Sequence, residues 1–265
     1  MTEFPQRGDA QGAAAVAPWY VEAFREDYRE LYAHRNVEAA RVETEWLARE
    51  VLSPVSGPVL DDCCGFGRHS LALRERGLPV VGIDLSLDLL RASAELPGAQ
   101  DLIVGRLARA DMRKLPFGTG SFGAVVNLFT SFGYLGEEGD AAALAEMARV
   151  LVPGGLLVMD LMNPVRVRAG LVPHTVEERA GRRLESRRAL ADGGRRVVKS
   201  VEMTSPEGDV KRWEESVRMF EPAELDRHLE AAGLSCEARA GDFSGEAFDA
   251  DRAERQIVLA RRRAQ

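Results

Sequence analysis

The chain has 265 residues, 45% of them hydrophobic and 29% charged, which is ordinary for a soluble protein with a sizeable core. This length fits one large α/β domain, or one domain with a small appendage. A net charge of -7 argues against a nucleic-acid binder that works through overall charge. Three cysteines, two of them adjacent, cannot form a disulfide framework, and the four histidines lack metal-ligand spacing. With no apolar run near the roughly 18 residues of a membrane helix and no signal-peptide core, we expect a cytoplasmic protein.

The first 54 residues differ in pattern from the rest. Residues 1–18 are rich in Gly, Ala, Gln and Pro without any period, so we expect a loose leader. Aromatic residues then recur at every fourth position, at Tyr20, Phe24, Tyr28 and Tyr32. This spacing predicts one helix with an aromatic face. Asn36 can cap a second helix that ends at Ser53 and Pro54. The residues that would share a face of this second helix are Ala39, Val42 and Trp46. We therefore predict a helical cap over residues 19–54.

From residue 55 onward, short apolar runs alternate with helical stretches. Strands that alternate with helices pair in parallel, so this part predicts an α/β fold with a doubly wound sheet. After Pro164 the alternation stops. The next three extended segments span residues 183–190, 195–204 and 210–220, and hairpin-type turns join them. We predict an antiparallel meander over 183–220, inserted into a domain that spans 55–265 and closes with a helix and two strands.

A glycine-containing turn follows the first strand of this domain. The strand ends at Asp61, Gly65 and Gly67 follow it, and a helix begins near Arg68. Glycines at such a turn let the backbone approach a ligand, and the helix start presents unpaired N–H groups beyond it. By itself this string is a weak signal, because any tight strand-to-helix turn favours glycine.

Three later segments strengthen this signal. Asp84 ends a second strand 23 residues after Asp61, a spacing that suits a carboxylate reaching ribose hydroxyls across a βαβ unit. Asp111 and Met112 stand where a third strand would end. Residues 149–155, Arg-Val-Leu-Val-Pro-Gly-Gly, form a helix exit and a turn before a buried strand. With these four motifs in order, the chain resembles the class I S-adenosylmethionine-dependent methyltransferases, over about residues 59–160.

The resemblance implies a Rossmann-like seven-stranded sheet, S-adenosylmethionine as cofactor, and methyl transfer by direct displacement. The residues that it places at the cofactor are Asp61, Cys63, Gly65, Gly67, Asp84, Leu85, Asp111, Met112, Asn127 and, on the helical cap, Tyr28. Asp84 would accept hydrogen bonds from the ribose, and Asp111 would contact the adenine. Two positions depart from the family pattern: Cys63 replaces the usual first glycine, and Gly123 replaces an acid often found before the fourth strand.

The acceptor side is less defined. The segment from Asn127 to Tyr134 resembles small-molecule-type members of the family, and it carries no Asn-Pro-Pro-Tyr-like run typical of amide-nitrogen acceptors. We expect a small-molecule acceptor in the crevice outside the strand ends. The residues expected to line it are Phe129, Ser131, Tyr134 and Asn163. A general base is optional, and no catalytic residue is assigned. We expect the meander to act as a lid over the acceptor. A role in a dimer contact stays open, and the protein is expected to be a monomer or a homodimer.

Other functions stay open at this point. A dehydrogenase shares the fold and the ribose acid, but Asp61 beside the turn would repel the pyrophosphate of a dinucleotide. RNA or protein acceptors remain alternatives, although the acidic net charge disfavours nucleic acid. A cofactor-binding sensor or structural subunit without turnover is a further alternative, but no motif is disrupted in a way that favours it.

Overall fold

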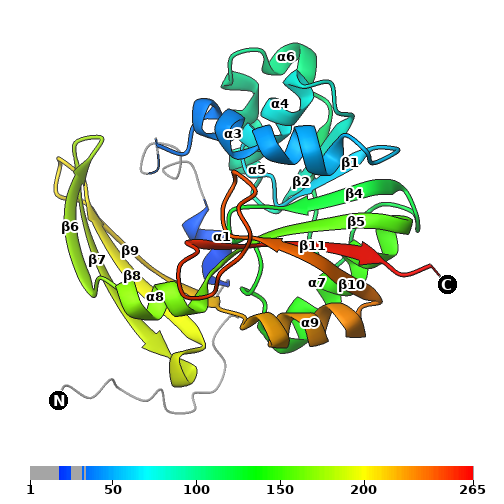
Figure 1. Cartoon of the computed structure of the whole chain (residues 1–265). Helices are drawn as coiled ribbons and strands as arrows, with labels where there is room; N and C mark the ends of the chain where they lie inside the picture. Colours follow the sequence, from blue (N-terminus) through cyan, green and yellow to red (C-terminus); the bar gives the residue numbers. More distant parts are fainter. Residues whose placement is uncertain (1–17, 25–31, 33, 265) are drawn as a thin grey trace, which may run out of the picture.

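The computed structural model describes residues 18–24, 32 and 34–264, and Figure 1 shows its two β-sheets. One sheet has seven strands in the order β10-β11-β5-β4-β1-β2-β3, and the other has four in the order β6-β7-β8-β9. Helix α1 (Trp19–Ala23) lies between the two sheets. Within the described part of the chain, no helix has the length and apolar character needed to cross a membrane. Tyr28 and the leader up to residue 17 fall outside the described residues.

The large sheet confirms the methyltransferase-type sheet expected from the sequence. Its strands are β1 (Val59–Asp62), β2 (Val80–Asp84), β3 (Leu107–Arg109), β4 (Phe122–Asn127), β5 (Leu151–Met162), β10 (Leu234–Ala240) and β11 (Arg255–Arg262). The first five pair in parallel, whereas β11 pairs antiparallel with both β5 and β10. All carboxyl ends of the parallel strands therefore meet at one edge of the sheet, which is where such sheets bind ligands.

Helices pack on both faces of this sheet (Figure 1). One group comprises α3 (Val37–Glu43), a π-helical turn η1 (Leu47–Leu52), α4 (Arg68–Glu75), α5 (Leu87–Ala92), the short turn η2 (Ser93–Glu95) and α6 (Ala99–Leu102). The opposite face carries α7 (Gly136–Val150) and α9 (Pro222–Ala231). Strand β4 is buried along its whole length: Val125 joins the cluster with α7, while Ala124 and Val126 join the cluster with η1. Successive side chains of a strand point to opposite faces, so one strand serves both cores.

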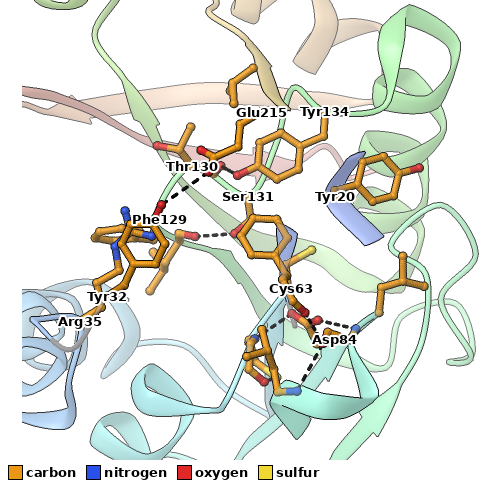
Figure 2. A pocket seen from close by; sticks show the side chains of 18 of the residues that line it. Tyr20, Tyr32, Arg35, Cys63, Asp84, Phe129, Thr130, Ser131, Tyr134 and Glu215 are labelled. Atoms are coloured by element: carbon orange, nitrogen blue, oxygen red, sulfur yellow. Dashed lines mark hydrogen bonds between the residues drawn. The ribbon is translucent and has the colours of Figure 1, made fainter. Parts of the chain in front are cut away.

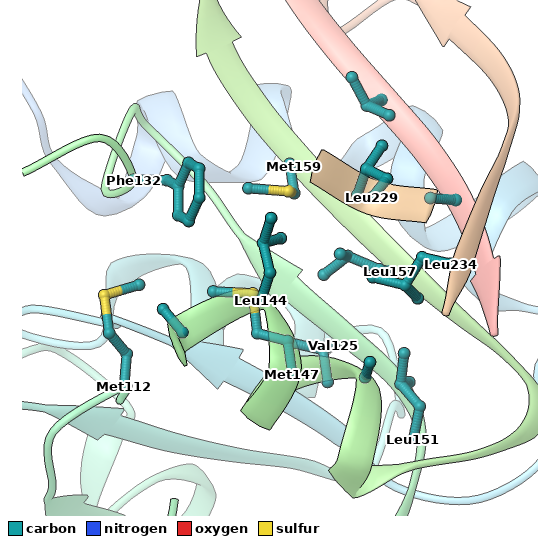
Figure 3. Packing of buried hydrophobic residues seen from close by; sticks show 14 of the residues in the cluster. Met112, Val125, Phe132, Leu144, Met147, Leu151, Leu157, Met159, Leu229 and Leu234 are labelled. Carbon is teal, nitrogen blue, oxygen red and sulfur yellow. The ribbon is translucent and has the colours of Figure 1, made fainter. Parts of the chain in front are cut away.

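The larger core fixes the strand ends in place. Figure 3 shows side chains of α7, α9 and the central strands packed together, with Leu144 and Met147 from α7 and Leu229 from α9. Met112, from the loop after β3, belongs to the same cluster. The loop at the carboxyl edge of the sheet is thus anchored through its own buried side chain.

The N-terminal cap differs from the sequence prediction. Helix α1 ends at Ala23, and Tyr32 lies in a turn, so the described part of this region is not one continuous aromatic helix. Asn36 caps α3 as predicted, with its side chain accepting a hydrogen bond from the backbone N–H of Ala39 at 2.9 Å. The face that carries Val42 is not the buried one, because Val42 is 69% exposed. The residues buried instead are Val37, Ala40 and Thr44.

The second sheet is the inserted meander, with one strand more than predicted. Its strands are β6 (His174–Arg179), β7 (Arg182–Ala191), β8 (Arg196–Thr204) and β9 (Val210–Arg218), with a short turn η3 (Asp192–Gly194) between β7 and β8. All neighbours pair antiparallel. Strand β6 escaped the sequence analysis because its less exposed positions are Thr175, Glu177 and Arg179, so no apolar alternation marks it.

The insert leaves and rejoins the large sheet at neighbouring points. It begins after β5 with α8 (Pro164–Gly170) and ends where β9 leads to α9. Gln256 of β11 pairs with Leu161 of β5 and donates a hydrogen bond to the carbonyl of Phe220 at 3.0 Å. Phe220 itself packs on Phe132, with ring centroids 5.3 Å apart. One residue of β11 therefore lies beside the end of the strand that precedes the insert and bonds the segment in which the insert ends.

Candidate active site

A cavity of about 610 Å³ lies between the carboxyl ends of the parallel strands and the insert. Residues of α1, of the loops after β1, β2 and β4, and of the insert all line it. Figure 2 shows Cys63 and Asp84 on one side and Tyr32, Arg35 and Phe129 on the other. Volumes of this size are typical of small-molecule sites. Below, the side with Cys63 and Asp84 is called the cofactor half, and the side with Phe129 and the insert the acceptor half.

The glycine turn has the backbone shape that the motif requires. Gly65 and Gly67 have φ angles of 58° and 79°, in the left-handed region that favours glycine. A Cβ on Gly67 would approach Leu107 Cδ1 to 2.8 Å, so this position also needs glycine for space. Cys63 has a φ of 64°, which explains why glycine usually occupies its place. Its Sγ lies 3.7 Å from the Sδ of Met112.

Asp84 links the turn to the next strand. Its Oδ2 accepts a hydrogen bond from the Gly65 N–H at 2.8 Å, and its Oδ1 accepts one from the Ser86 N–H at 2.7 Å. Burial raises the pKa of Asp84, and these two backbone donors oppose that rise. Asp84 lines the cavity, and a carboxylate oxygen has lone pairs for more than one donor. It can therefore hold the turn and still accept hydrogen bonds from a ligand.

Behind this turn lie two buried acids that do not line the cavity. Asp61 accepts a hydrogen bond from Ser70 Oγ at 2.6 Å and so ties β1 to the first turn of α4. Asp62 accepts one from Asn127 Nδ2 at 3.2 Å. Burial raises the pKa of each carboxyl to about 7, and the neighbouring acids add to the rise. The other oxygens of this pair, Asp62 Oδ1 and Asn127 Oδ1, are buried without a hydrogen-bond partner.

Asp111 sits at the other end of the cofactor half. The Arg113 guanidinium and backbone N–H both bond to it, at 2.6 Å and 2.9 Å, and they lower the pKa of this carboxyl. Asp111, Leu85 and Met112 all line the cavity, so an acid and two apolar side chains gather there.

The structure brings most of the sequence-predicted site residues together. Those that line the cavity are Cys63, Gly65, Asp84, Leu85, Asp111, Met112, Phe129, Ser131 and Tyr134. Asp61, Gly67 and Asn127 lie behind them and shape the turn. Asn163 does not line the cavity: its Oδ1 caps α8, and its Nδ2 donates to the carbonyls of Ala250 and Ala253 at 2.8 and 2.7 Å. Its side chain is used for structure, because every polar atom already has a partner.

The loop after β4 carries backbone strain. Phe129 and Thr130 have φ angles of 62° and 58°, which is unfavourable for a β-branched residue such as Thr130. The buried Asp160 of β5 holds this loop, because its Oδ2 accepts from the Phe129 N–H at 2.8 Å and its backbone carbonyl from the Thr130 N–H at 2.9 Å. Arg255 pairs with Asp160 at 2.7 Å and donates to Thr130 Oγ1 at 2.7 Å. This network directs Phe129 into the cavity (Figure 2).

The sequence analysis missed the charged residues of the acceptor half. They are Arg35, Arg68, Arg179, Arg188, Lys199, Glu215 and Arg255, and they come from the N-terminal segment, α4, the insert and β11. No spacing along the chain connects them, since the fold alone assembles them. Lys199 donates to Tyr32 Oη at 2.8 Å and to Glu215 at 3.2 Å, and so links the insert to the N-terminal segment.

A buried histidine–glutamate pair was also missed. His69 Nε2 lies 2.7 Å from Glu43 Oε2, which also accepts from Arg68 at 2.5 Å. Burial, and then the Arg68 charge, lower the pKa of His69, which keeps its ring neutral at pH 7. His69 lines the cavity, whereas Glu43 does not.

Two kinds of comparison place the chain among known proteins. Residues 59–155 match a family described as a methyltransferase domain. The chain is 32% identical over 148 residues to a putative methyltransferase of Bacillus subtilis, YqeM, and this match covers 55% of the chain and 57% of that relative. It is 30% identical over 200 residues to the dTDP-3-amino-3,4,6-trideoxy-alpha-D-glucopyranose N,N-dimethyltransferase of Streptomyces venezuelae, covering 73% of the chain and 81% of the relative.

Solved structures agree with this. The CcbJ methyltransferase of Streptomyces caelestis has a TM-score of 0.77 at 23% identity, over 93% of this chain and 99% of that one. CalS10, an amino pentose methyltransferase of Micromonospora echinaspora solved with bound S-adenosylmethionine, has a TM-score of 0.58 at 27% identity, over 95% and 100%. With the glycine turn, the acid at the end of β2 and the sheet order all in place, the chain belongs to the S-adenosylmethionine-dependent methyltransferases.

Proposed function

We propose that this methyltransferase acts on a small molecule that enters between the insert and the strand ends. The observation that supports this best is the single cavity that joins the two halves. The cofactor motif lines one half, and residues from all four strands of the insert line the other. A volume of about 610 Å³ must hold the cofactor together with the reacting part of the acceptor, which favours a small acceptor.

The cofactor half fits S-adenosylmethionine. Asp84 presents a carboxylate with spare acceptor capacity where a ribose would lie, and Leu85 and Met112 offer apolar surfaces for the adenine. Gly65 leaves space for a ligand, since a Cβ there would meet only Leu89 Cδ1, at 3.8 Å. When bound, this cofactor supplies an activated methyl group that an acceptor lone pair takes in a direct displacement. The protein's task is then to align the acceptor and exclude water.

The insert supplies the cover of the acceptor half. Val197 and Val217 line the cavity from β8 and β9, and Tyr32 packs against the buried pair Leu184 and Met203. The inward side of the insert is therefore covered within one chain. This contact supports a lid over the acceptor and does not need a second subunit.

His69 is suited to accept a proton where the acceptor group carries one. It lines the cavity, its pKa is lowered by burial and by Arg68, and Glu43 would stabilise the ring once protonated. The proton would move from the acceptor atom to the imidazole while the acceptor gains the methyl group. An acceptor amine that is already neutral would not need this step.

Two experiments test the proposal. S-adenosylmethionine and its demethylated product should each raise the melting temperature, whereas NAD should not, because a ligand stabilises the native state by its affinity for it. Stabilisation by NAD alone would refute the cofactor assignment. The protein is then incubated with methyl-labelled cofactor and a cell extract separated into metabolite, RNA and protein fractions. Label in the metabolite fraction is expected, and label confined to RNA or protein would contradict a small-molecule acceptor.

A further inference from the structure

The acceptor half of the cavity is strongly cationic. The basic side chains that line it are Arg35, Arg68, Arg179, Arg188, Lys199 and Arg255. Among the described residues that line this half, the acidic one is Glu215. The chain as a whole has a net charge of -7, so this concentration of positive charge runs against the overall balance. Four separate parts of the sequence contribute to it, which indicates a site formed by the fold.

Two aromatic rings bring these cations close together. The Phe129 ring centroid lies 4.4 Å from the Arg35 guanidinium and 4.8 Å from that of Arg68. The Tyr32 ring lies 4.3 Å from Arg35, 5.4 Å from the Lys199 ammonium and 5.8 Å from Arg179. Ring faces attract cations, but they offset only part of the repulsion among like charges. Arg179 also pairs with Glu177 at 2.5 Å, so acids as well as ring faces stabilise this cluster.

The acids that pair with these cations mostly lie behind them. Glu43 binds Arg68, and the fully buried Asp160 binds Arg255, but neither acid lines the cavity. Glu215 is engaged by Lys199 and accepts a further hydrogen bond from Trp213 Nε1 at 3.1 Å. Among the described acids named here, only Glu215 lines the cavity.

Among the described cations of the acceptor half, Arg188 most clearly lacks an acidic partner. Its guanidinium donates to Thr175 Oγ1 at 3.2 Å and more weakly to the Val172 carbonyl at 3.4 Å. Over the residues that the structure describes, it forms no ion pair, although it lines the cavity. A half-buried guanidinium without a carboxylate partner is well placed to bind an anionic ligand group.

The same basic residues also affect the pKa of His34. Burial contributes most to the lowering of its pKa, and the charges of Arg35, Arg179 and Arg68 lower it further. The charge of Glu177 opposes this lowering of the pKa.

From this convergence we infer that the methyl acceptor carries a phosphate or carboxylate group, which Arg188 of β7 and its register partner Lys199 of β8 bind under the insert. The inference rests on the proposed function, since it names the class of acceptor for that site. Guanidinium groups bind planar or tetrahedral oxyanions with paired hydrogen bonds, and an ammonium adds a point charge. The anionic group would anchor the acceptor at the insert and leave its nucleophilic end toward the cofactor half.

The test uses the full chain loaded with S-adenosylhomocysteine. Inorganic pyrophosphate and citrate are titrated separately by calorimetry at constant ionic strength, with chloride as the reference. Arg188→Met should weaken binding of the favoured anion about tenfold. Arg187→Met is the matched control: this residue neighbours Arg188 on β7, its side chain is 69% exposed, and it pairs with Glu185. Its effect should be about twofold at most, as for other exposed ion pairs.

The outcomes separate the two proposals. Binding of pyrophosphate alone indicates a phosphate group, binding of citrate alone a carboxylate, and either supports the inference. Absence of binding for both anions, or an equal loss in the two variants, would overturn it. If S-adenosylhomocysteine itself does not bind, the proposed function fails first. A labelled product from the extract should also be retained on an anion-exchange resin at neutral pH, and an unretained product would refute the anionic acceptor while leaving methyl transfer intact.

Discussion

The two halves of the cavity are built in different ways. The cofactor half consists of short motifs at the ends of consecutive parallel strands, and its charged residues are acids such as Asp84 and Asp111. The acceptor half is assembled from distant segments, and its charge is basic. In the cofactor half, each residue is positioned by the turn that it belongs to. In the acceptor half, residues such as Arg35 and Arg188 line the same cavity only because the insert folds over the sheet. In the proposed function, the cofactor half sets the reaction class and the acceptor half selects the molecule that is methylated.

Removal of the insert gives the largest expected effect and tests whether the two halves are separable. Replacement of residues 171–219 by a short linker, with Phe220 kept for its packing on Phe132, should abolish methyl transfer and leave cofactor binding largely unchanged. A control variant shortens only the exposed turn between β8 and β9, at Ser205–Asp209, and should keep full activity. Both are measured by turnover and by calorimetry with the cofactor. Full turnover of the deletion variant would show that the insert does not shape the acceptor site.

Arg255 holds the loop after β4 through Asp160, so its removal should destabilise the fold. Arg255→Met leaves a buried carboxylate unpaired and should lower the free energy of unfolding by about 3–5 kcal/mol. The strained loop at Phe129 and Thr130 would lose a support as well. Denaturant unfolding measures the effect, with the exposed Arg252→Met as control. A loss equal to that of the control would mean that the network does not hold the loop.

Substitution of Asp84 tests the cofactor half without a change in the acceptor half. Asp84→Ala should weaken cofactor binding by about 1.5–3 kcal/mol, the scale of hydrogen bonds to a charged group. Part of the loss comes from the Gly65 turn, which Asp84 also holds. Asp84→Asn keeps one acceptor oxygen and should lose less, while Asp88→Ala, on the next helix and away from the cavity lining, serves as control. An unchanged dissociation constant in folded Asp84→Ala would refute the ribose assignment.

Asp62, buried behind the glycine turn of the cofactor half, should make the stability of the fold depend on pH. Its carboxyl has a pKa of about 7 in the folded chain and about 3.9 in an unfolded one. The folded state therefore binds more protons between pH 4 and 7, and stability falls as the pH rises through that window. Asp62→Asn removes this proton uptake and can donate to Asn127 Oδ1, so it should raise stability at pH 8 by about 1–3 kcal/mol. Thermal unfolding across pH 4 to 8 checks this, and an unchanged slope would contradict it.

Substitution of Cys63 should have the smallest effect on stability. Cys63→Gly relieves a left-handed backbone but increases the freedom of the unfolded chain and removes the contact with Met112, so stability should change by less than about 1 kcal/mol. Cys63→Val should cost more, since a β-branched residue fits this conformation poorly. Melting temperatures of the two variants compare them directly. Equal stability of the Gly and Val variants would show that the turn does not constrain this position.

The contrast between the halves also explains what the sequence could predict. The alternation of strands and helices, the glycine turn and the acids at strand ends are local patterns, so the large sheet was predicted correctly. Most residues predicted to bind the cofactor line one cavity, and their role stays a prediction. The sequence did not indicate which face of α3 is buried, because Val42 is apolar yet exposed and only the packing partner decides such a face. Asn163 was placed in the crevice because it follows β5, although its side chain caps α8. The basic residues of the acceptor half have no shared spacing, so no pattern could indicate them.

The two ends of the insert meet at Gln256, and this has a consequence for how acceptor preference can change. Gln256 pairs with Leu161, near the point where the insert leaves, and bonds the Phe220 carbonyl, where it returns. A segment whose ends lie side by side can be lengthened, shortened or exchanged at small entropic cost, because the closing distance stays the same. One contiguous stretch of gene can thus be recombined as a cassette. Chimeras joined at these two points should inherit the donor's acceptor and the recipient's cofactor affinity, which makes this junction a natural place to engineer new methylation chemistry.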